Sequence, residues 1–95
     1  MIVTGRSAKY RAETLAWLDR WGLSVDHLVM RDWDIDLGRN WNEQMGEYKA
    51  WHYQDARSGC PLFAESDPAQ AEVINRLTGK AVLCPSAAKV HPPAA

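Results

Sequence analysis

Hydrophobic residues along the chain fall into two kinds of segment that alternate from the first residue onward. Short, continuous apolar runs predict β-strands at residues 1–3, 25–30, 61–64 and 81–84. Longer segments with apolar residues on one side predict helices at residues 7–21, 47–57 and 68–78. Residues 31–46 have no clear period and are interpreted as a loop. The order β-α-β-loop-α-β-α-β is typical of an α/β fold, in which helices cover both faces of a doubly wound parallel sheet.

Residue types at the predicted helix ends agree with these boundaries. Ser7 has the side chain of an N-cap, and Gly22 stands where a left-handed C-terminal cap belongs. Asp67 followed by Pro68 predicts the start of a further helix, with Asp67 preferred over Ser66 as its cap.

Tryptophan is the one unusual feature of the composition, since it supplies 5 of the 9 aromatic residues. A short chain needs large side chains to build a core, so we interpret the tryptophans as core residues or as contacts with a partner. The predicted helix over residues 7–21 shows this as a one-sided stripe of Tyr10, Thr14, Trp17, Leu18 and Trp21.

Length, charge and cysteine content narrow the class of protein. The 95 residues, 46% hydrophobic and 24% charged, predict one domain over residues 1–85 and a flexible tail over residues 86–95. A net charge of −1 gives no general electrostatic attraction to nucleic acids or acidic membranes. No apolar run is long enough to span a membrane, and no signal peptide is recognisable. Cys60 and Cys84 have no metal-type spacing, so we expect free thiols and a cytoplasmic protein.

Residues with side chains suited to binding or catalysis follow three of the predicted strands, in the segments 4–6, 30–31 and 65–67. Because carboxyl ends of parallel strands meet at one edge of a sheet, these segments are expected to converge there. Thr4 offers a hydroxyl, Gly5 allows close approach of the backbone to a ligand, and Arg6 adds a positive charge for an anion. The alternative interpretation of these residues is a glycine turn between strand and helix, followed by an arginine on the surface.

Lys49 and the segment 65–67 complete the candidate chemistry. Lys49 is either a solvated helix residue or a charge clamp on a phosphate. The carboxylates of Glu65 and Asp67 are oxygen ligands of the kind that Mg²⁺ prefers, with Glu65 the better candidate because Asp67 is expected to cap a helix.

Several of these segments together resemble a known family. V-T-G-R at residues 3–6, an amphipathic segment, and D-H-L-V-M-R at residues 26–31 are similar to the second-motif region of haloacid dehalogenase superfamily phosphatases. Within that superfamily, the resemblance is closest to the phosphatase domain of polynucleotide kinases and related phage proteins. Lys49 stands in the place of the third motif, and A-E-S-D-P at residues 64–68 in that of the fourth.

The resemblance implies a Mg²⁺-dependent phosphomonoester hydrolase that acts on nucleic-acid ends or nucleotides. Thr4 would hydrogen-bond the transferring phosphoryl group, and Lys49 would neutralise its charge. Glu65, with Asp67 as the weaker candidate, would hold the metal. Substrate contacts would come from Gly5, Arg6 and Arg31.

Two departures from the family pattern change what is expected of this chain. The fourth motif has Glu65-Ser66 where the family has two adjacent aspartates. The first motif, an apolar strand ending in Asp-x-Asp that supplies the nucleophile, does not precede Thr4, and Asp34-x-Asp36 does not follow a buried strand. We therefore expect a truncated or split phosphatase-like domain that is inactive as an isolated chain.

The missing strand lies at the centre of the family's sheet, which leaves about four strands here and two structural outcomes. The flanking strands could pair directly, in the order 2-1-3-4, or a strand from a complementing chain or a second copy could fill the slot. A non-catalytic binding or regulatory module is the alternative function, suggested by Trp33, Trp41 and Trp51. A start codon placed too late, or a split gene, would make the complete protein an ordinary enzyme.

Overall fold

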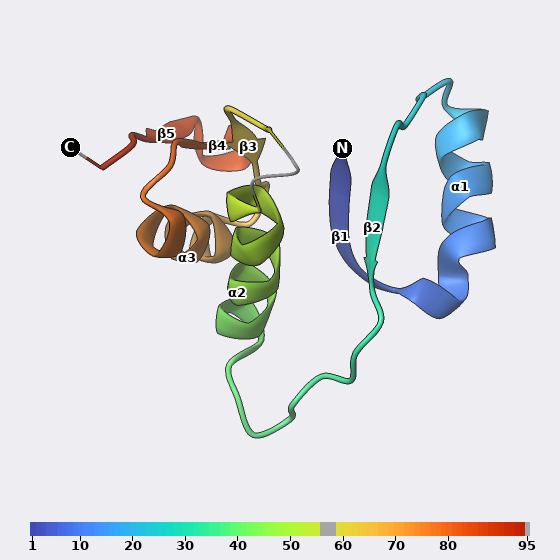
Figure 1. Ribbon diagram of the computed structural model, residues 1–95, viewed down its shortest axis with the longest axis horizontal. Helices are drawn as coiled ribbons and strands as arrows, with labels where there is room; N and C mark the ends of the chain where they lie inside the picture. The colour runs from blue at the N-terminus through green and yellow to red at the C-terminus, as the bar shows by residue number, and fades with distance from the viewer. Residues whose placement is uncertain (56–58, 95) are drawn as a thin grey trace. The chain divides into compact units, whose positions relative to one another are not determined.

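The chain is a mixed α/β protein that divides into two compact units, Met1–Asp34 and Ile35–Ala95. A computed structural model describes residues 1–55 and 59–94 (Figure 1). Where the sequence predicts one domain over residues 1–85, the contacts thus group into two units with a boundary after Asp34.

The first unit contains two parallel strands and one helix. Its elements are β1 (Ile2–Ser7), the 3₁₀ turn η1 (Ala8–Tyr10), α1 (Arg11–Arg20) and β2 (Leu28–Arg31). β1 pairs with β2 in parallel, as predicted, with Ile2 opposite Leu28 and Thr4 opposite Met30. Leu18 of α1 packs against Leu28 and Met30, and this small cluster is the core of the unit.

The start of the first helix differs in detail from the prediction. Ser7 does act as an N-cap, since its hydroxyl accepts a hydrogen bond from the Lys9 N–H at 3.5 Å, but it caps a 3₁₀ turn. The α-helix itself begins at Arg11, and β1 continues through Ser7 with an irregular register after Thr4. The predicted C-terminal cap is confirmed, because Gly22 has a φ of +70°.

The interpretation of the tryptophans as core residues is wrong for the four that lie on α1, at its C-terminal end and on α2. Thr14 and Leu18 of the predicted stripe are buried, whereas Trp17 and Trp21 are 54% and 66% exposed. Trp41 and Trp51 are exposed as well, at 46% and 58%. The cores are built from smaller aliphatic side chains instead.

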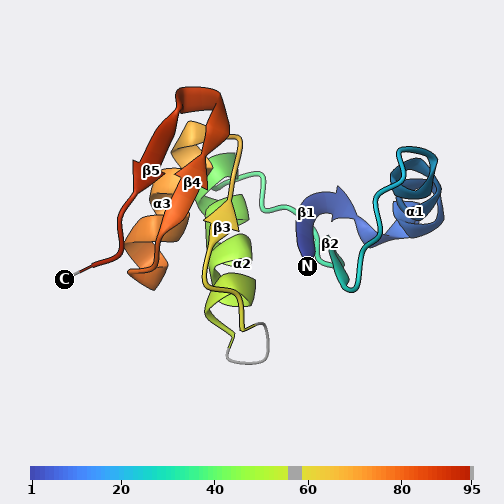
Figure 2. The ribbon, with the colours of Figure 1, turned by 90° about the horizontal axis from the view of Figure 1, so that it is seen from above.

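The second unit packs two helices against one face of a three-stranded sheet (Figures 1 and 2). Its elements are α2 (Trp41–Gln54), β3 (Phe63–Ala64), α3 (Pro68–Thr78), β4 (Val82–Cys84), the 3₁₀ turn η2 (Pro85–Ala87) and β5 (Lys89–His91). The strand order is β3-β4-β5, with β3 and β4 parallel, as predicted, and β4 and β5 antiparallel. Pairing of β1 with β3, one of the two predicted outcomes, is not among the ladders that the described residues form.

Helix α2 starts six residues earlier than predicted, at Trp41 in place of residue 47. The carboxamide oxygen of Asn40 caps it by accepting from the Glu43 N–H at 3.1 Å. The buried Gln44 side chain binds the preceding loop through both backbone groups of Asp36, at 2.8 and 2.7 Å. Residues 41–46 therefore belong to the helix, and the loop after β2 ends at Asn40.

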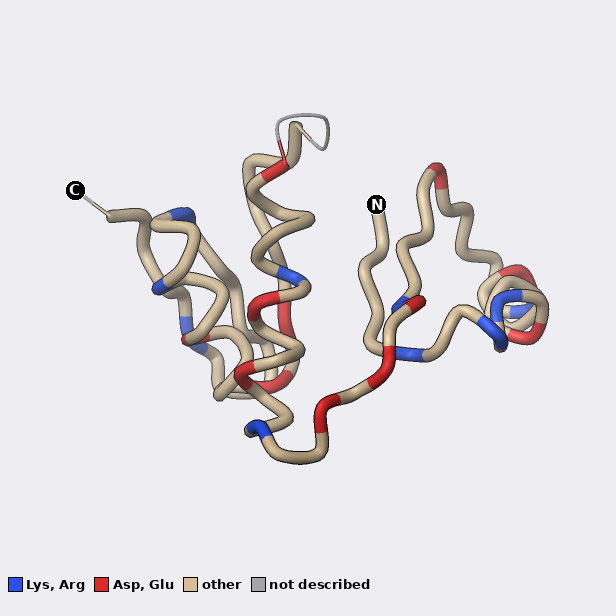
Figure 3. The backbone as a smooth tube through the Cα atoms, turned by 60° about the horizontal axis from the view of Figure 1, so that its bottom comes forward, with Lys and Arg blue, Asp and Glu red and all other residues tan. Residues whose placement is uncertain are grey.

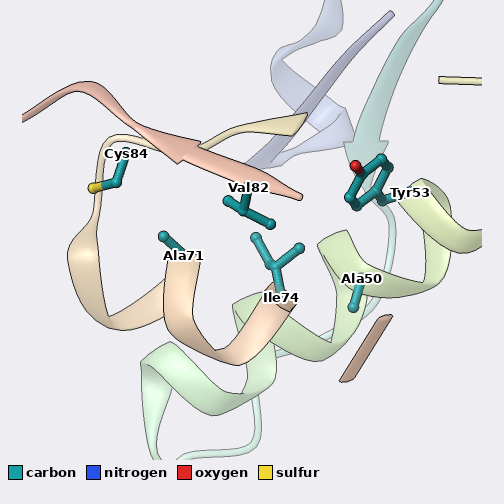
Figure 4. Packing of buried hydrophobic residues seen from close by; sticks show 6 residues of the cluster. All are labelled: Ala50, Tyr53, Ala71, Ile74, Val82 and Cys84. Carbon is teal, nitrogen blue, oxygen red and sulfur yellow. The ribbon is translucent and has the colours of Figure 1, made fainter. Parts of the chain in front are cut away.

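The core of the second unit lies between the sheet and its two helices. Figure 4 shows side chains of α2, α3 and β4 around this space. The buried cluster consists of Ala50, Tyr53, Ala71, Ile74, Val82 and Cys84. The Tyr53 hydroxyl donates to the Ala81 carbonyl at 2.6 Å, so the one polar group of the cluster is satisfied. Cys84 is buried and Cys60 is half-buried, and no disulfide joins them.

The C-terminal residues form a strand where the sequence predicts a flexible tail. β5 pairs with β4 along its length, with Leu83 opposite Val90. The Asn75 carboxamide donates to the carbonyls of Lys80 and Pro92, at 3.0 and 2.9 Å. No helix within residues 1–55 and 59–94 has the length and apolar character needed to cross a membrane.

Candidate functional site

The candidate site of the second unit is built on a buried ion pair between Lys49 and Glu65. The Lys49 ammonium group donates to Glu65 Oε2 at 2.7 Å and to Gln70 Oε1 at 2.8 Å. Lys49 and Glu65 are only 9% and 8% exposed. The structure thus brings together two of the predicted site residues, from the middle of α2 and from the end of β3.

Local structure after β3 holds the Glu65 carboxylate in place. Glu65 continues the ladder, with its N–H donating to the Leu83 carbonyl at 2.9 Å. Its second carboxylate oxygen, Oε1, accepts from the Asp67 N–H at 3.2 Å. Asp67 then caps α3, as predicted, through Oδ1 and the N–H groups of Ala69 and Gln70, at 2.9 and 3.2 Å.

The network continues from Gln70 to the start of α2. Gln70 Nε2 donates to Asn42 Oδ1 at 3.2 Å, while Gln70 Oε1 accepts from Lys49. Gln70 is 5% exposed. Its carboxamide is therefore buried, and these two hydrogen bonds satisfy both of its ends. Neither Gln70 nor Asn42 was predicted from the sequence. The one available signal for Gln70 is its position in the first turn of the helix that Asp67 caps.

The residues proposed as metal ligands do not complete a metal site by themselves. The carboxylate of Glu65 is already engaged at both oxygens, and a cationic ammonium group lies 2.7 Å from one of them. Asp67 uses its carboxylate to cap α3. Within the described part of the chain, no group of three His, Cys, Asp or Glu side chains could hold a metal ion. We therefore assign no chemical step to Mg²⁺.

The remaining predicted residues lie in the first unit, around the end of β1. Thr4 Oγ1 accepts from the Arg6 N–H at 3.2 Å, and the Gly5 carbonyl accepts from Arg31 Nε at 2.9 Å. Arg31 also donates to the Trp33 carbonyl. Arg31 therefore fixes the irregular end of β1 to β2, which is a structural role that the sequence did not reveal.

A hollow of about 370 Å³ lies at this end of the first unit. Its walls include Gly5, Arg6, Lys9, Tyr10, Arg31 and Asp34. Arg6 Cζ and Lys9 Nζ lie 6.0 and 5.1 Å from the centre of the Tyr10 ring. Figure 3 shows the basic segments around the turn after β1, in contrast to the acidic residues along the loop after β2. Lys9 and Tyr10 are additions to the predicted set.

Shifted pKa values occur in the core and on the surface of the second unit. Burial raises the pKa of the Tyr53 phenol in the core. On the surface, the hydrogen bond from Arg39 at 2.7 Å lowers the pKa of the Glu47 carboxyl.

The geometry thus defines a mixed α/β protein with a buried Lys–Glu pair in one unit and a basic hollow in the other. The predicted convergence of residues 4–6 and 65–67 on one sheet edge stays a prediction. Comparison of the chain with protein-family models, curated proteins and solved structures finds no match.

Proposed function

We propose that the chain is a truncated or split phosphomonoester hydrolase domain of the haloacid dehalogenase superfamily. In this proposal a central strand from outside residues 1–95, parallel to β1 and β3, completes a three-layer α/β fold. The substrates are nucleic-acid ends or nucleotides that carry a terminal phosphate. The isolated chain is inactive, because none of its apolar strands ends in the Asp-x-Asp that would supply the nucleophile.

The observation that carries the proposal is the contact between Lys49 and Glu65. The resemblance assigns these residues to the third and fourth motifs, from segments that are 16 positions apart. Their side chains meet at 2.7 Å although nothing in their spacing requires it. The parallel β1–β2 and β3–β4 pairs also agree with the strand neighbours that such a fold requires.

The residues of this chain would act by binding and by neutralising charge. An ammonium group has three N–H donors, of which Glu65 and Gln70 take two from Lys49. The third is able to bind a phosphoryl oxygen or the carboxylate of a nucleophile. In the proposed reaction the Thr4 hydroxyl donates to a phosphoryl oxygen, where negative charge is stabilised best by donors already in place.

The test uses the DNA directly upstream of the Met1 codon. The chain is extended through any upstream apolar segment that ends in Asp-x-Asp, whether this segment is in frame with Met1 or frameshifted. The extended chains are assayed in magnesium buffer with a generic phosphomonoester and with a 3′-phosphorylated oligonucleotide. We expect hydrolysis by the extended chain and none by residues 1–95. Thr4→Val and Lys49→Arg should lower kcat at least about 100-fold, while the exposed Lys89→Arg should leave it unchanged.

Two outcomes would contradict the proposal. One is the absence of hydrolysis by every extended chain; the other is hydrolysis that is indifferent to both substitutions. Magnesium-dependent turnover by residues 1–95 alone, abolished by Lys49→Ala, would show that the expected inactivity is wrong.

A non-catalytic binding module is the second candidate function, and the exposed tryptophans favour it. Trp17 and Trp21 form an edge-on pair with ring centres 6.5 Å apart on the outer side of α1. Exposed aromatic residues are enriched at protein interfaces. Self-association of residues 1–95 in sedimentation equilibrium, abolished by Trp17→Gln with Trp21→Gln, would support this function. A monomeric wild-type chain would count against it.

A further inference from the structure

The outer face of α1 carries charged and aromatic residues in an order that is complementary to a second copy of the same helix. The spacing i, i+3, i+4 and i+7 places four residues on one face: Glu13, Ala16, Trp17 and Arg20. All four are exposed, and Trp17 is exposed by 54%. The face therefore presents an aromatic ring with an acidic group toward one end of the helix and a basic group toward the other.

The two charges of this face do not satisfy each other within one chain. Seven residues of helix separate Glu13 from Arg20 by about 10.5 Å along the axis, which is too far for an ion pair. Within residues 1–55 and 59–94, the structure gives neither of them an ion pair with another side chain. Both charges can thus be used in a contact with a partner.

The positions of these charges select one arrangement of two helices. Glu13 and Arg20 are equally far from the midpoint between Ala16 and Trp17. In a two-fold symmetric interface, residue i contacts residue j of the partner, and j contacts i. An antiparallel pair with its axis at that midpoint therefore places Glu13 opposite the partner's Arg20 on both sides of the axis. A parallel pair in register would place each charge opposite its own kind, which is unfavourable.

The centre of the antiparallel pair would be apolar. The same two-fold axis brings Trp17 against the partner's Trp17, and Ala16 against the partner's Ala16. The small Ala16 side chain allows the two helix axes to approach closely. Trp21, which is 66% exposed, extends the aromatic surface, because its ring lies edge-on to that of Trp17 with ring centres 6.5 Å apart. Tryptophan at the centre of an interface is a frequent source of binding energy.

We propose that two copies of the chain associate through antiparallel α1 helices, with Trp17 at the two-fold axis and an ion pair between Glu13 and the partner's Arg20 on each side. The inference is independent of the proposed hydrolase. It rests on the second candidate function, for which it names the arrangement of the two copies and the charged residues that select it. Because one helix face makes a small interface, we expect a dissociation constant in the micromolar range.

The experiment measures the dissociation constant of the dimer by sedimentation equilibrium. The chain of residues 1–95 is used at about 5–500 µM, in reducing buffer so that no disulfide forms between chains. The variants are Glu13→Arg, Arg20→Glu and Trp17→Ala, together with an equimolar mixture of the two charge variants. Asp19→Arg is the matched control, because it changes the charge as Glu13→Arg does, at an exposed residue of α1 outside this face. Far-ultraviolet circular dichroism checks the fold of each variant.

We expect Glu13→Arg and Arg20→Glu each to raise the dissociation constant at least about tenfold, because each replaces both ion pairs with contacts between like charges. Their mixture should return to within about threefold of the wild-type value, since a heterodimer of the two variants has opposite charges on both sides of the axis. Trp17→Ala should also raise the constant at least about tenfold, while Asp19→Arg should leave it unchanged. For the unchanged chain, added sodium chloride should weaken the dimer by screening the ion pairs.

A wild-type chain that stays monomeric over this range would overturn the inference together with the second candidate function. A dimer that neither charge variant weakens, or that the mixture of the two fails to restore, would overturn the inference alone, because the tryptophans would then associate in another arrangement. A wild-type dimer that is indifferent to salt would overturn it as well, whatever the variants do. The proposed hydrolase fails separately, when every extended chain lacks hydrolysis.

Discussion

Removal of one partner of the Lys49–Glu65 pair should destabilise the second unit strongly. In Lys49→Met the apolar replacement has a similar length, but it leaves the Glu65 carboxylate without its counter-ion at a side-chain exposure of 9%. Breaking a buried pair in this way costs about 3–5 kcal/mol. The whole free energy of unfolding expected for a chain of 95 residues is about 5–14 kcal/mol. The single substitution should therefore remove a large fraction of the stability.

Removal of both charges together should cost less than the two single changes added. In Lys49→Met with Glu65→Gln, no unpaired charge stays buried, and the amide oxygen can still accept from the Asp67 N–H that Glu65 now binds. The desolvation penalty of the native pair is also relieved. We expect the double variant to be more stable than the sum of the single effects predicts, by about 2 kcal/mol.

Urea unfolding, followed by tryptophan fluorescence and by far-ultraviolet circular dichroism, measures these free energies. Lys89→Met is the matched control, because Lys89 is exposed and substitutions of this kind change stability by no more than about 0.5 kcal/mol. The reasoning is refuted if Lys49→Met lies within the range of this control. Additive single effects would refute it as well, because they would show that the two side chains do not interact.

Three further predictions concern the same unit. Gly46→Ala should lower the free energy of unfolding by about 1–3 kcal/mol in urea titrations, because the new Cβ would lie 2.4 Å from Val73 Cγ1. Asp67→Ala should cost about 1 kcal/mol in the same assay, through loss of the α3 cap, whereas Asp67→Asn should cost less. Burial raises the pKa of Tyr53, so the unfolded chain releases the phenol proton first. The stability contributed by Tyr53 should be complete below its ordinary pKa of 10.0 and decline as the pH rises through the folded-state pKa, and Tyr53→Phe should flatten this decline in urea midpoints measured against pH.

The sequence was sufficient for elements whose ends carry a local signal. Asp67 and Pro68 predicted the start of α3, and the structure has both in the expected positions. Gly79, just beyond that helix, has a φ of +65°, the left-handed geometry that favours glycine at a helix end. Such signals work because each depends on backbone groups only a few residues away.

The first turns of α2 were missed because their signal competes with residues that serve tertiary packing. Asn40 with Glu43 has the pattern of a capping box, but Gly46 weakens the apparent helix. The structure shows why a glycine stands there: α2 approaches α3 so closely that a Cβ at residue 46 would overlap Val73. The exposure of the tryptophans on α1 and α2 also could not be deduced, since it depends on which elements cover which face. For the candidate site, the sequence supplied Lys49 and Glu65 separately, whereas their contact depends on the packing of α2 against the end of β3.

The first unit gives a physical reason, independent of any motif, to expect that a further strand pairs with β1. Parallel sheets are found almost entirely with several strands and with both faces covered, and a pair of strands alone is marginally stable. Here β1 and β2 form a parallel sheet of two strands, and the one α-helix of the unit buries only Thr14 and Leu18. A cluster of Leu18, Leu28 and Met30 is a small core to offset the conformational entropy of this many ordered residues. Within the described residues the ladder of β1 is the one with β2, and a further strand would bind through the backbone groups on its other edge. Addition of a strand there would extend the sheet beside Thr4, which is also where the proposed hydrolase requires its nucleophile.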